Sequence, residues 1–259
     1  MYPCICSMGF ESVEPLALIV SRSADAQARD TAAHTLGSLV NTSPAHAQAV
    51  LSVPGILEAM AENLKYALHC ATSGLSLPPV VGVMYAFVSM QDHVKGLQKS
   101  RFLPFCTLWL SLLFLPEDSL EVGVKVDVLD VLEKVISACS SSIEDVETLA
   151  TLSSPDFLRY LTTCVNHEDI QLSNKAGGLL TAMTEVDAVM GAMFTVDFGN
   201  LLLTMLTGRN SLQGSALIAM YNAMVDMSAP PDLFLDNEAF VSFRVFGIPI
   251  PISDSSWIV

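Results

Sequence analysis

The size and charge of the chain limit what kind of protein it can be. Its 259 residues are 51% hydrophobic and 15% charged, which permits a large core, in one or two ordinary domains or in one elongated repeat array, and argues against disorder. Acidic residues outnumber basic ones by 27 to 12, and the net charge of −15 argues against duplex DNA and anionic lipid as partners.

A long helix followed by two shorter ones is the first pattern along the chain. Apolar residues recur every three to four positions over 32–40, which is the period of one helix face. Ser43 can cap the next helix and Pro44 can occupy its first turn, so the long helix is expected to end before them. Pro54 and Gly55 then form a corner between the two shorter helices.

Helical patterns continue through most of the chain. Strand-like alternation is almost confined to 240–246, and beyond Gly247 alternating prolines extend the backbone. Besides the long helices, shorter helices are predicted over 15–21, 45–52, 56–68, 92–99, 101–115, 143–152, 156–165, 187–195 and 198–206. The chain thus divides into an irregular N-terminal segment (1–14), a helical domain (15–246) and an extended C-terminal tail (247–259).

The apolar face of the long helix recurs at a nearly constant interval. The pattern is apolar three residues before an anchor, at the anchor, and three and four residues after it, and it returns with gaps of 48, 48, 47 and 41 residues. The five anchors are Leu36, Met84, Leu132, Leu179 and Met220. This spacing is close to the repeat length of about 40–47 residues in armadillo and HEAT proteins.

The order long helix, short helix, glycine corner, medium helix resembles an armadillo-type repeat. The long helix of that repeat usually reads Ala-Ala-x-x-Leu-x-Asn-Leu, and Ala-Ala-His-Thr-Leu-Gly-Ser-Leu stands at 32–39 here. The resemblance implies an all-α, right-handed α-solenoid of about five armadillo-like three-helix repeats whose long helices line a concave face. The Trp and Asn ladder by which nuclear-import adaptors of this superfamily grip peptides is not expected, since only Asn222 fits it.

Two apolar segments raise the question of a membrane, because a mean hydropathy of +0.49 is high for a soluble protein. Segment 71–90 carries no charge but is interrupted by Pro78 and Pro79. Segment 102–115 is shorter than the roughly 20 residues that cross a bilayer. Both are therefore predicted to be buried helices, and a membrane-associated helical protein that uses them is the alternative.

Motifs of common enzymes do not occur in the sequence. It lacks a P-loop, a Gly-x-Ser-x-Gly elbow and a His-Glu-x-x-His zinc helix. The histidines and cysteines are scattered, and the one-residue gap between Cys4 and Cys6 does not fit a zinc or thioredoxin site. Gly177 and Gly178 fall inside a predicted long helix and indicate close helix packing. We expect no enzymatic activity, no cofactor and no metal, with free buried thiols in a cytoplasmic protein.

Acidic residues concentrate in the middle of the chain. Between residues 117 and 169 there are 12 acidic residues and 3 basic ones. Asp127, Asp130 and Glu133 are spaced three apart, so they share one side of a long helix. Such a stripe either faces solvent only or docks a basic protein segment.

Four further residues complete the set of candidate partner-binding residues. Lys134 and Asn222 occupy the position two residues after their anchors, where armadillo proteins place a peptide-binding asparagine. Trp257 and Val259 resemble a C-terminal ligand for a PDZ-type groove, unless the tail folds onto the last helix. The sequence therefore predicts a non-enzymatic scaffold or adaptor that binds proteins through its concave face or an exposed apolar edge, with self-association or a larger assembly as a further expectation.

Overall fold

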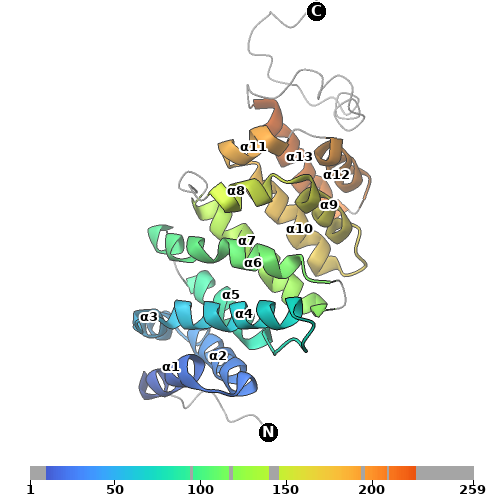
Figure 1. Cartoon of the computed structure of the whole chain (residues 1–259). Coiled ribbons are helices and arrows are strands. Elements are labelled where there is room, and N and C mark those ends of the chain that lie inside the picture. Colours follow the sequence, from blue (N-terminus) through green and yellow to red (C-terminus); the bar gives the residue numbers. More distant parts are fainter. Residues whose placement is uncertain are drawn as a thin grey trace, which may run out of the picture.

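Every regular element that the structure describes is a helix (Figure 1). The computed structural model describes residues 10–93, 96–116, 119–139, 146–193, 196–208 and 210–225. The all-α prediction is confirmed for these residues, and none of their helices is long and apolar enough to cross a membrane. The predicted tail, including Trp257 and Val259, lies outside the described residues.

The α-helices of the described residues have 7 to 18 residues. The five that carry the predicted anchors are called the long helices, although Ile56–Thr72, with 17 residues, is longer than all of them except Val122–Cys139. In chain order the elements are η2 (Phe10–Ser12), α1 (Val13–Arg22), α2 (Ala26–Val40), α3 (Pro44–Ser52), α4 (Ile56–Thr72), α5 (Val81–His93), η3 (Gly96–Phe105), α6 (Cys106–Leu113), α7 (Val122–Cys139), α8 (Val146–Leu152), α9 (Pro155–Val165), α10 (Ile170–Met183), α11 (Asp187–Met193), α12 (Val196–Thr207) and α13 (Asn210–Val225).

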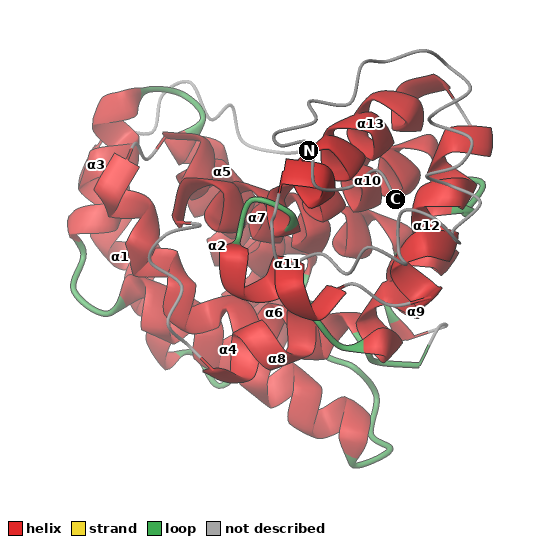
Figure 2. Cartoon of the chain, turned by 90° about the horizontal axis from the view of Figure 1, so that it is seen from above, coloured by secondary structure: helices red, strands yellow, loops and turns green. Residues whose placement is uncertain are grey.

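The long helices pack in series. α2 contacts α5, α5 contacts α7, α7 contacts α10 and α10 contacts α13. Seen from above, α5, α7, α10 and α13 lie along one side of the molecule, and α4, α6, α8 and α9 lie along the other (Figure 2). The five anchor residues fall one in each long helix and are all fully buried. The recurring apolar face of the sequence is therefore the face that each long helix buries.

Two helix boundaries follow the predicted capping chemistry. The Ser43 hydroxyl accepts a hydrogen bond from the His46 amide at 3.2 Å, and Pro44 begins α3. Gly55 has φ = +74°, a left-handed conformation that a side chain would disfavour. These residues set the angle at which α3 and α4 leave α2.

Some predictions of extent and exposure are wrong. The helix predicted over 101–115 begins as α-helix only at Cys106, because Pro104 lacks an amide donor and the preceding turns form the 3₁₀ helix η3. The segment 71–90 is divided by a loop over 73–80, so only its second half forms α5. Val81, predicted on the buried face, is 42% exposed because α5 begins at this residue.

Two large aromatic side chains of segment 102–115 form part of the core, as predicted, whereas Phe114 is 46% exposed. Phe102 and Trp109 are fully buried, together with Phe87 of α5. The Phe87 and Trp109 rings meet edge to face with centroids 5.3 Å apart, a favourable geometry for aromatic pairs. These rings hold η3 and α6 against the layer of long helices.

Candidate functional site

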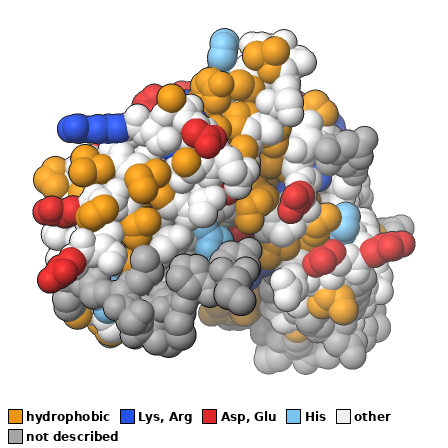
Figure 3. All heavy atoms as spheres, turned by 90° about the horizontal axis from the view of Figure 1, so that it is seen from below, with side chains coloured by type: hydrophobic (Ala, Val, Ile, Leu, Met, Phe, Trp, Pro, Cys, Tyr) orange, Lys and Arg blue, Asp and Glu red, His pale blue; other side chains and the backbone are white. Residues whose placement is uncertain are grey.

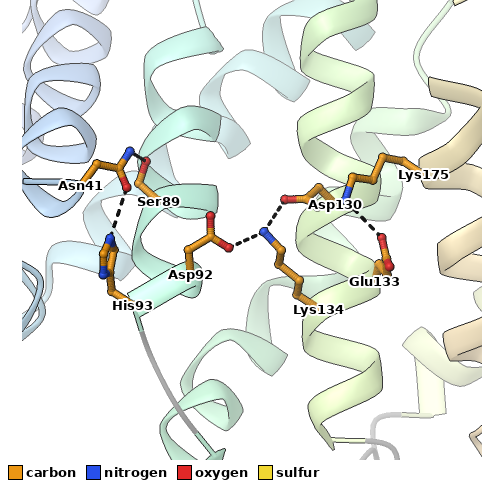
Figure 4. A network of polar contacts seen from close by, with 8 residues as sticks. All are labelled: Asn41, Ser89, Asp92, His93, Asp130, Glu133, Lys134 and Lys175. Carbon is orange, nitrogen blue, oxygen red and sulfur yellow. Dashed lines mark hydrogen bonds and ion pairs between the residues drawn. The ribbon is translucent and has the colours of Figure 1, made fainter. Parts of the chain in front are cut away.

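Polar side chains join the first four long helices, α2, α5, α7 and α10, one to the next (Figure 4). They come from the end of α2, the second half of α5, the middle of α7 and the first half of α10. This set, which we call the polar row, comprises Asn41, Ser89, Asp92, His93, Asp130, Glu133, Lys134 and Lys175.

The row begins where α2 ends. The Asn41 amide donates hydrogen bonds to the Tyr85 hydroxyl and to the Ser89 hydroxyl, each at 3.0 Å. Its carbonyl oxygen lies 3.3 Å from Nε2 of His93. Ser89 is buried, so these bonds satisfy a hydroxyl that water does not reach. Asn41 thereby fixes the C-terminal end of α2 to α5.

Ion pairs continue the row across α5, α7 and α10. The Lys134 ammonium contacts the Asp92 carboxylate of α5 and lies 2.7 Å from Oδ2 of Asp130. Lys175 of α10 contacts the other oxygen of Asp130 and lies 3.5 Å from Oε2 of Glu133. Asp130 is only 6% exposed. Its carboxylate therefore accepts from two ammonium groups that belong to different helices.

The local charges decide the ionisation of these groups. Burial alone would raise the pKa of Asp130, but hydrogen bonds and attraction from Lys134 and Lys175 outweigh it and lower this pKa. Burial would likewise lower the pKa of each lysine, and their carboxylate partners outweigh it and raise both values. All three groups are therefore ionised across the physiological pH range.

Asp127 lies one turn before Asp130 and takes no part in any salt bridge of the described residues. Burial, and then repulsion by Asp130, raise its pKa to about 6, against a smaller lowering by Lys134. Asp130 and Glu133 each pair with a lysine, so of the three predicted stripe residues Asp127 is the one left without a salt bridge to the described chain.

Replacing Asp127 with asparagine is expected to stabilise the protein above pH 6. Folding raises the pKa of Asp127 from 3.8 to about 6, so the folded state favours the protonated carboxyl group. The stability that this protonation contributes is fully present below about pH 4 and is lost as pH rises through about 6. After a discount for solvent screening, Asp127→Asn should gain about 1 kcal/mol near neutral pH and little at about pH 4. Urea unfolding of the wild type and the variant at both pH values measures the difference in unfolding free energy. Glu185→Gln, in an exposed turn, is the control, and equal stabilities near neutral pH would contradict the assignment.

The last two long helices are joined by neutral groups. The Asn222 amide of α13 donates to the Thr184 hydroxyl at 3.0 Å, and the Thr181 hydroxyl donates to the Ser215 carbonyl at 3.4 Å. Asn222, a predicted candidate for partner binding, is thus hydrogen-bonded within the chain. Every pair of successive long helices has at least one polar side-chain contact.

The structure brings most of the candidate residues together. Asp127, Asp130, Glu133 and Lys134 share α7, while Asn222 lies on α13 and contacts α10 instead. Sequence reasoning missed the remaining members of the row. The sequence held a signal for two of them: Asn41 and Ser89 occupy the same position in the repeat, five residues after their anchors.

Metal binding and thiol chemistry depend on how the histidines, cysteines and carboxylates are arranged. Within the described ranges, His, Cys, Asp and Glu form no group of three or more that could hold a metal ion. Cys70, Cys106 and Cys164 are buried thiols outside any disulfide, as predicted for these three cysteines.

Apolar side chains occur on the end of the molecule at which α1 lies. Figure 3 shows this face, where hydrophobic side chains are spread among acidic ones. On α1 itself, Leu18 is 49% and Ile19 40% exposed. The end of a helical stack with such residues is the kind of apolar edge that the sequence predicts for contacts with another protein.

Comparison with known proteins gives a fold but no family. No family model matches the chain, and no curated protein matches it. A solved structure described as an engineered protein, a target of the Northeast Structural Genomics Consortium, is similar, with a TM-score of 0.68 over 96% of this chain and 92% of that one. At 15% identity this likeness concerns the helical fold alone.

Proposed function

We propose that this chain is a right-handed, armadillo-like α-solenoid and acts as a non-enzymatic scaffold that binds protein partners along its long helices. After α1 and α2, four units of three helices, each ending in a helix that carries an anchor, fit this architecture: α3–α4–α5, η3–α6–α7, α8–α9–α10 and α11–α12–α13. In such an array each unit buries its apolar face against its neighbours, and the repeated helices form an extended binding surface.

The observation that carries the proposal is the polar row. It crosses four successive long helices, and three of its charged groups stay accessible, with side-chain exposures of 47% for Asp92, 36% for Lys175 and 30% for Glu133, while Asp130 is buried. The salt bridges of the row do not neutralise every carboxylate of α7, because Asp127 has no salt bridge among the described residues. A protein segment that presents lysine or arginine side chains to α5 and α7 complements this charge.

Charge reversal of the two least constrained carboxylates tests the proposal. The full chain, the double variant Asp92→Lys/Asp127→Lys and the control Glu14→Lys/Glu58→Lys, which reverses exposed glutamates of α1 and α4, serve as baits for capture and mass spectrometry. Basic partners should bind the wild type and the control, with at least about tenfold less recovered on the double variant. Equal recovery on all three baits rejects the polar row as the binding surface.

A membrane-associated helical protein that uses segments 71–90 and 102–115 is the alternative. The core positions of Phe102 and Trp109 argue against it, because these side chains would have to leave the core to meet lipid. Co-sedimentation with phosphatidylcholine vesicles would favour the alternative. The buried thiols fit a reducing compartment and support a cytoplasmic location as part of the proposal.

A further inference from the structure

A groove of about 690 Å³ lies on the layer of shorter helices. It is lined by Phe114 at the end of α6, by Glu147, Ala150 and Thr151 of α8, and by residues along α9 from Asp156 to Thr163. None of these helices contributes to the polar row. The groove is therefore a second surface, and its binding properties do not depend on the function proposed for the long helices.

The groove has an aromatic wall. Phe114, the residue after α6, is 46% exposed, although its ring centroid lies 6.0 Å from those of both Phe157 and Tyr160. Phe157 is fully buried and stacks on Tyr160 with centroids 6.4 Å apart. One side of the Phe114 ring is thus held by its neighbours while the rest meets water. A ligand that covers it gains the free energy of burying apolar surface, about 25 cal/mol per Å².

Carboxylates dominate the charge of the groove. The Arg159 guanidinium is already paired, at 2.9 Å with Oδ1 of Asp156 and at 3.3 Å with Oδ2 of Asp197. Glu147, in the first turn of α8, is exposed and forms no salt bridge with a described residue. The groove lining thus holds two carboxylates, Glu147 and Asp156, against one guanidinium, and Asp197 of α12 adds a third carboxylate that pairs with that guanidinium. This excess of negative charge repels anions and attracts a cation, and an aromatic wall attracts a cation further.

We propose that this groove binds a segment of a partner protein in which a lysine or arginine lies within a few residues of a large apolar side chain. The apolar side chain covers Phe114 and packs beside Tyr160. The cation pairs with Glu147, which has no competing partner among the described residues. The negative charge of the walls disfavours acidic segments in the same place.

Fluorescence anisotropy with defined peptides tests this proposal on the full chain. The probe is a fluorescein-labelled peptide Gly-Leu-Arg-Phe-Lys-Leu-Gly; a second peptide carries Glu at both basic positions and a third carries Ser at the three apolar ones. The first should bind, and each of the others should bind at least about tenfold more weakly, since each loses one of the two contributions.

Variants then locate the binding. Glu147→Lys should lower the affinity for the first peptide by about tenfold, and Phe114→Ser should lower it by a similar factor. Glu58→Lys is the matched control, because Glu58 is also an exposed glutamate in the first turn of its helix. Leu75→Ser removes another exposed apolar side chain, 61% exposed against 46% for Phe114, outside the groove. Both controls should leave the affinity unchanged.

Several results would overturn the proposal. The first is an absence of saturable binding up to about 1 mM peptide. The second is that Glu58→Lys weakens peptide binding as much as Glu147→Lys does. The third is that peptide affinity falls in Asp92→Lys/Asp127→Lys and not in Glu147→Lys. Self-association that Glu147→Lys abolishes would show that the occupant is a second copy of the chain. If Phe114→Ser unfolds the protein, Glu147→Lys decides the question alone, since its side chain is exposed.

Discussion

Replacing Gly82 with alanine is expected to destabilise the fold by about 3 kcal/mol. An added Cβ would lie 2.1 Å from the carbonyl oxygen of Asp30 and 2.9 Å from Cβ of His34, both on α2. The first of these is a backbone atom, which cannot rotate away. α5 would therefore have to move off α2, the helix against which it packs in the layer of long helices.

Movement of α5 would also break a buried hydrogen bond. The Asp30 carboxylate accepts from the Val83 amide at 3.0 Å, and Asp30 is 7% exposed. An aspartate of one helix thus satisfies a free amide in the first turn of another, where a negative charge is favourable. The close approach at Gly82 is what brings this carboxylate within reach.

Urea unfolding followed by circular dichroism measures the effect. Gly214→Ala is the control, because a Cβ at Gly214 in α13 would meet no atom within 4 Å. That change should stabilise the protein by up to about 1 kcal/mol, the difference in helix propensity between the two residues. If Gly82→Ala is as stable as the wild type, the contact between α2 and α5 is looser than the structure indicates.

The contrast between Leu36 and Gly82 shows what sequence can predict here. Leu36 is buried because it lies on the apolar face of its own helix. The sequence shows that face directly, as apolar residues three and four positions apart. Gly82 is required by a carbonyl of a different helix, 52 positions earlier in the chain. Periodicity reports which side of a helix is buried, but not how closely another backbone approaches it.

The same limit applies to the candidate site. Three acidic residues on α7 were predicted to share one side, and local spacing was sufficient for that. Whether they face solvent depends on Lys175, which lies 45 positions after Asp130 and pairs with it only because α10 packs on α7. The stripe therefore divides into a paired, buried Asp130 and an unpaired Asp127.

Replacing Asp130 with alanine is expected to destabilise the protein by about 2 kcal/mol near neutral pH. Removing one partner of a buried ion pair costs about 3–5 kcal/mol, because the other charge is left without compensation. Lys134 and Lys175 are 27% and 36% exposed, so water screens them in part and the cost is smaller. Lys175 also keeps its contact with Glu133.

The pH dependence of this effect distinguishes a loss of charge pairing from a loss of packing. Because the folded-state pKa of Asp130 is lowered, its stabilising contribution is present above the ordinary pKa near 4 and is lost as pH falls below it. The difference in unfolding free energy between wild type and Asp130→Ala should therefore shrink below about pH 4. A difference that stays constant with pH would assign the effect to packing.

Two further variants show whether the row acts as a unit across α5, α7 and α10. Asp92 is 47% exposed, so Asp92→Ala should cost only about 0.5 kcal/mol. Adding Lys175→Met to Asp130→Ala removes one of the two cations that lost Asp130 as a partner, and should recover up to about half of the loss, because Lys175 otherwise keeps only its 3.5 Å contact with Glu133 among the described residues. Recovery would mean that the carboxylate of α7 serves mainly to neutralise the lysine that α10 brings to it. The two helices then hold their register through this pair, and a basic partner that competes for Asp130 would loosen the contact between them.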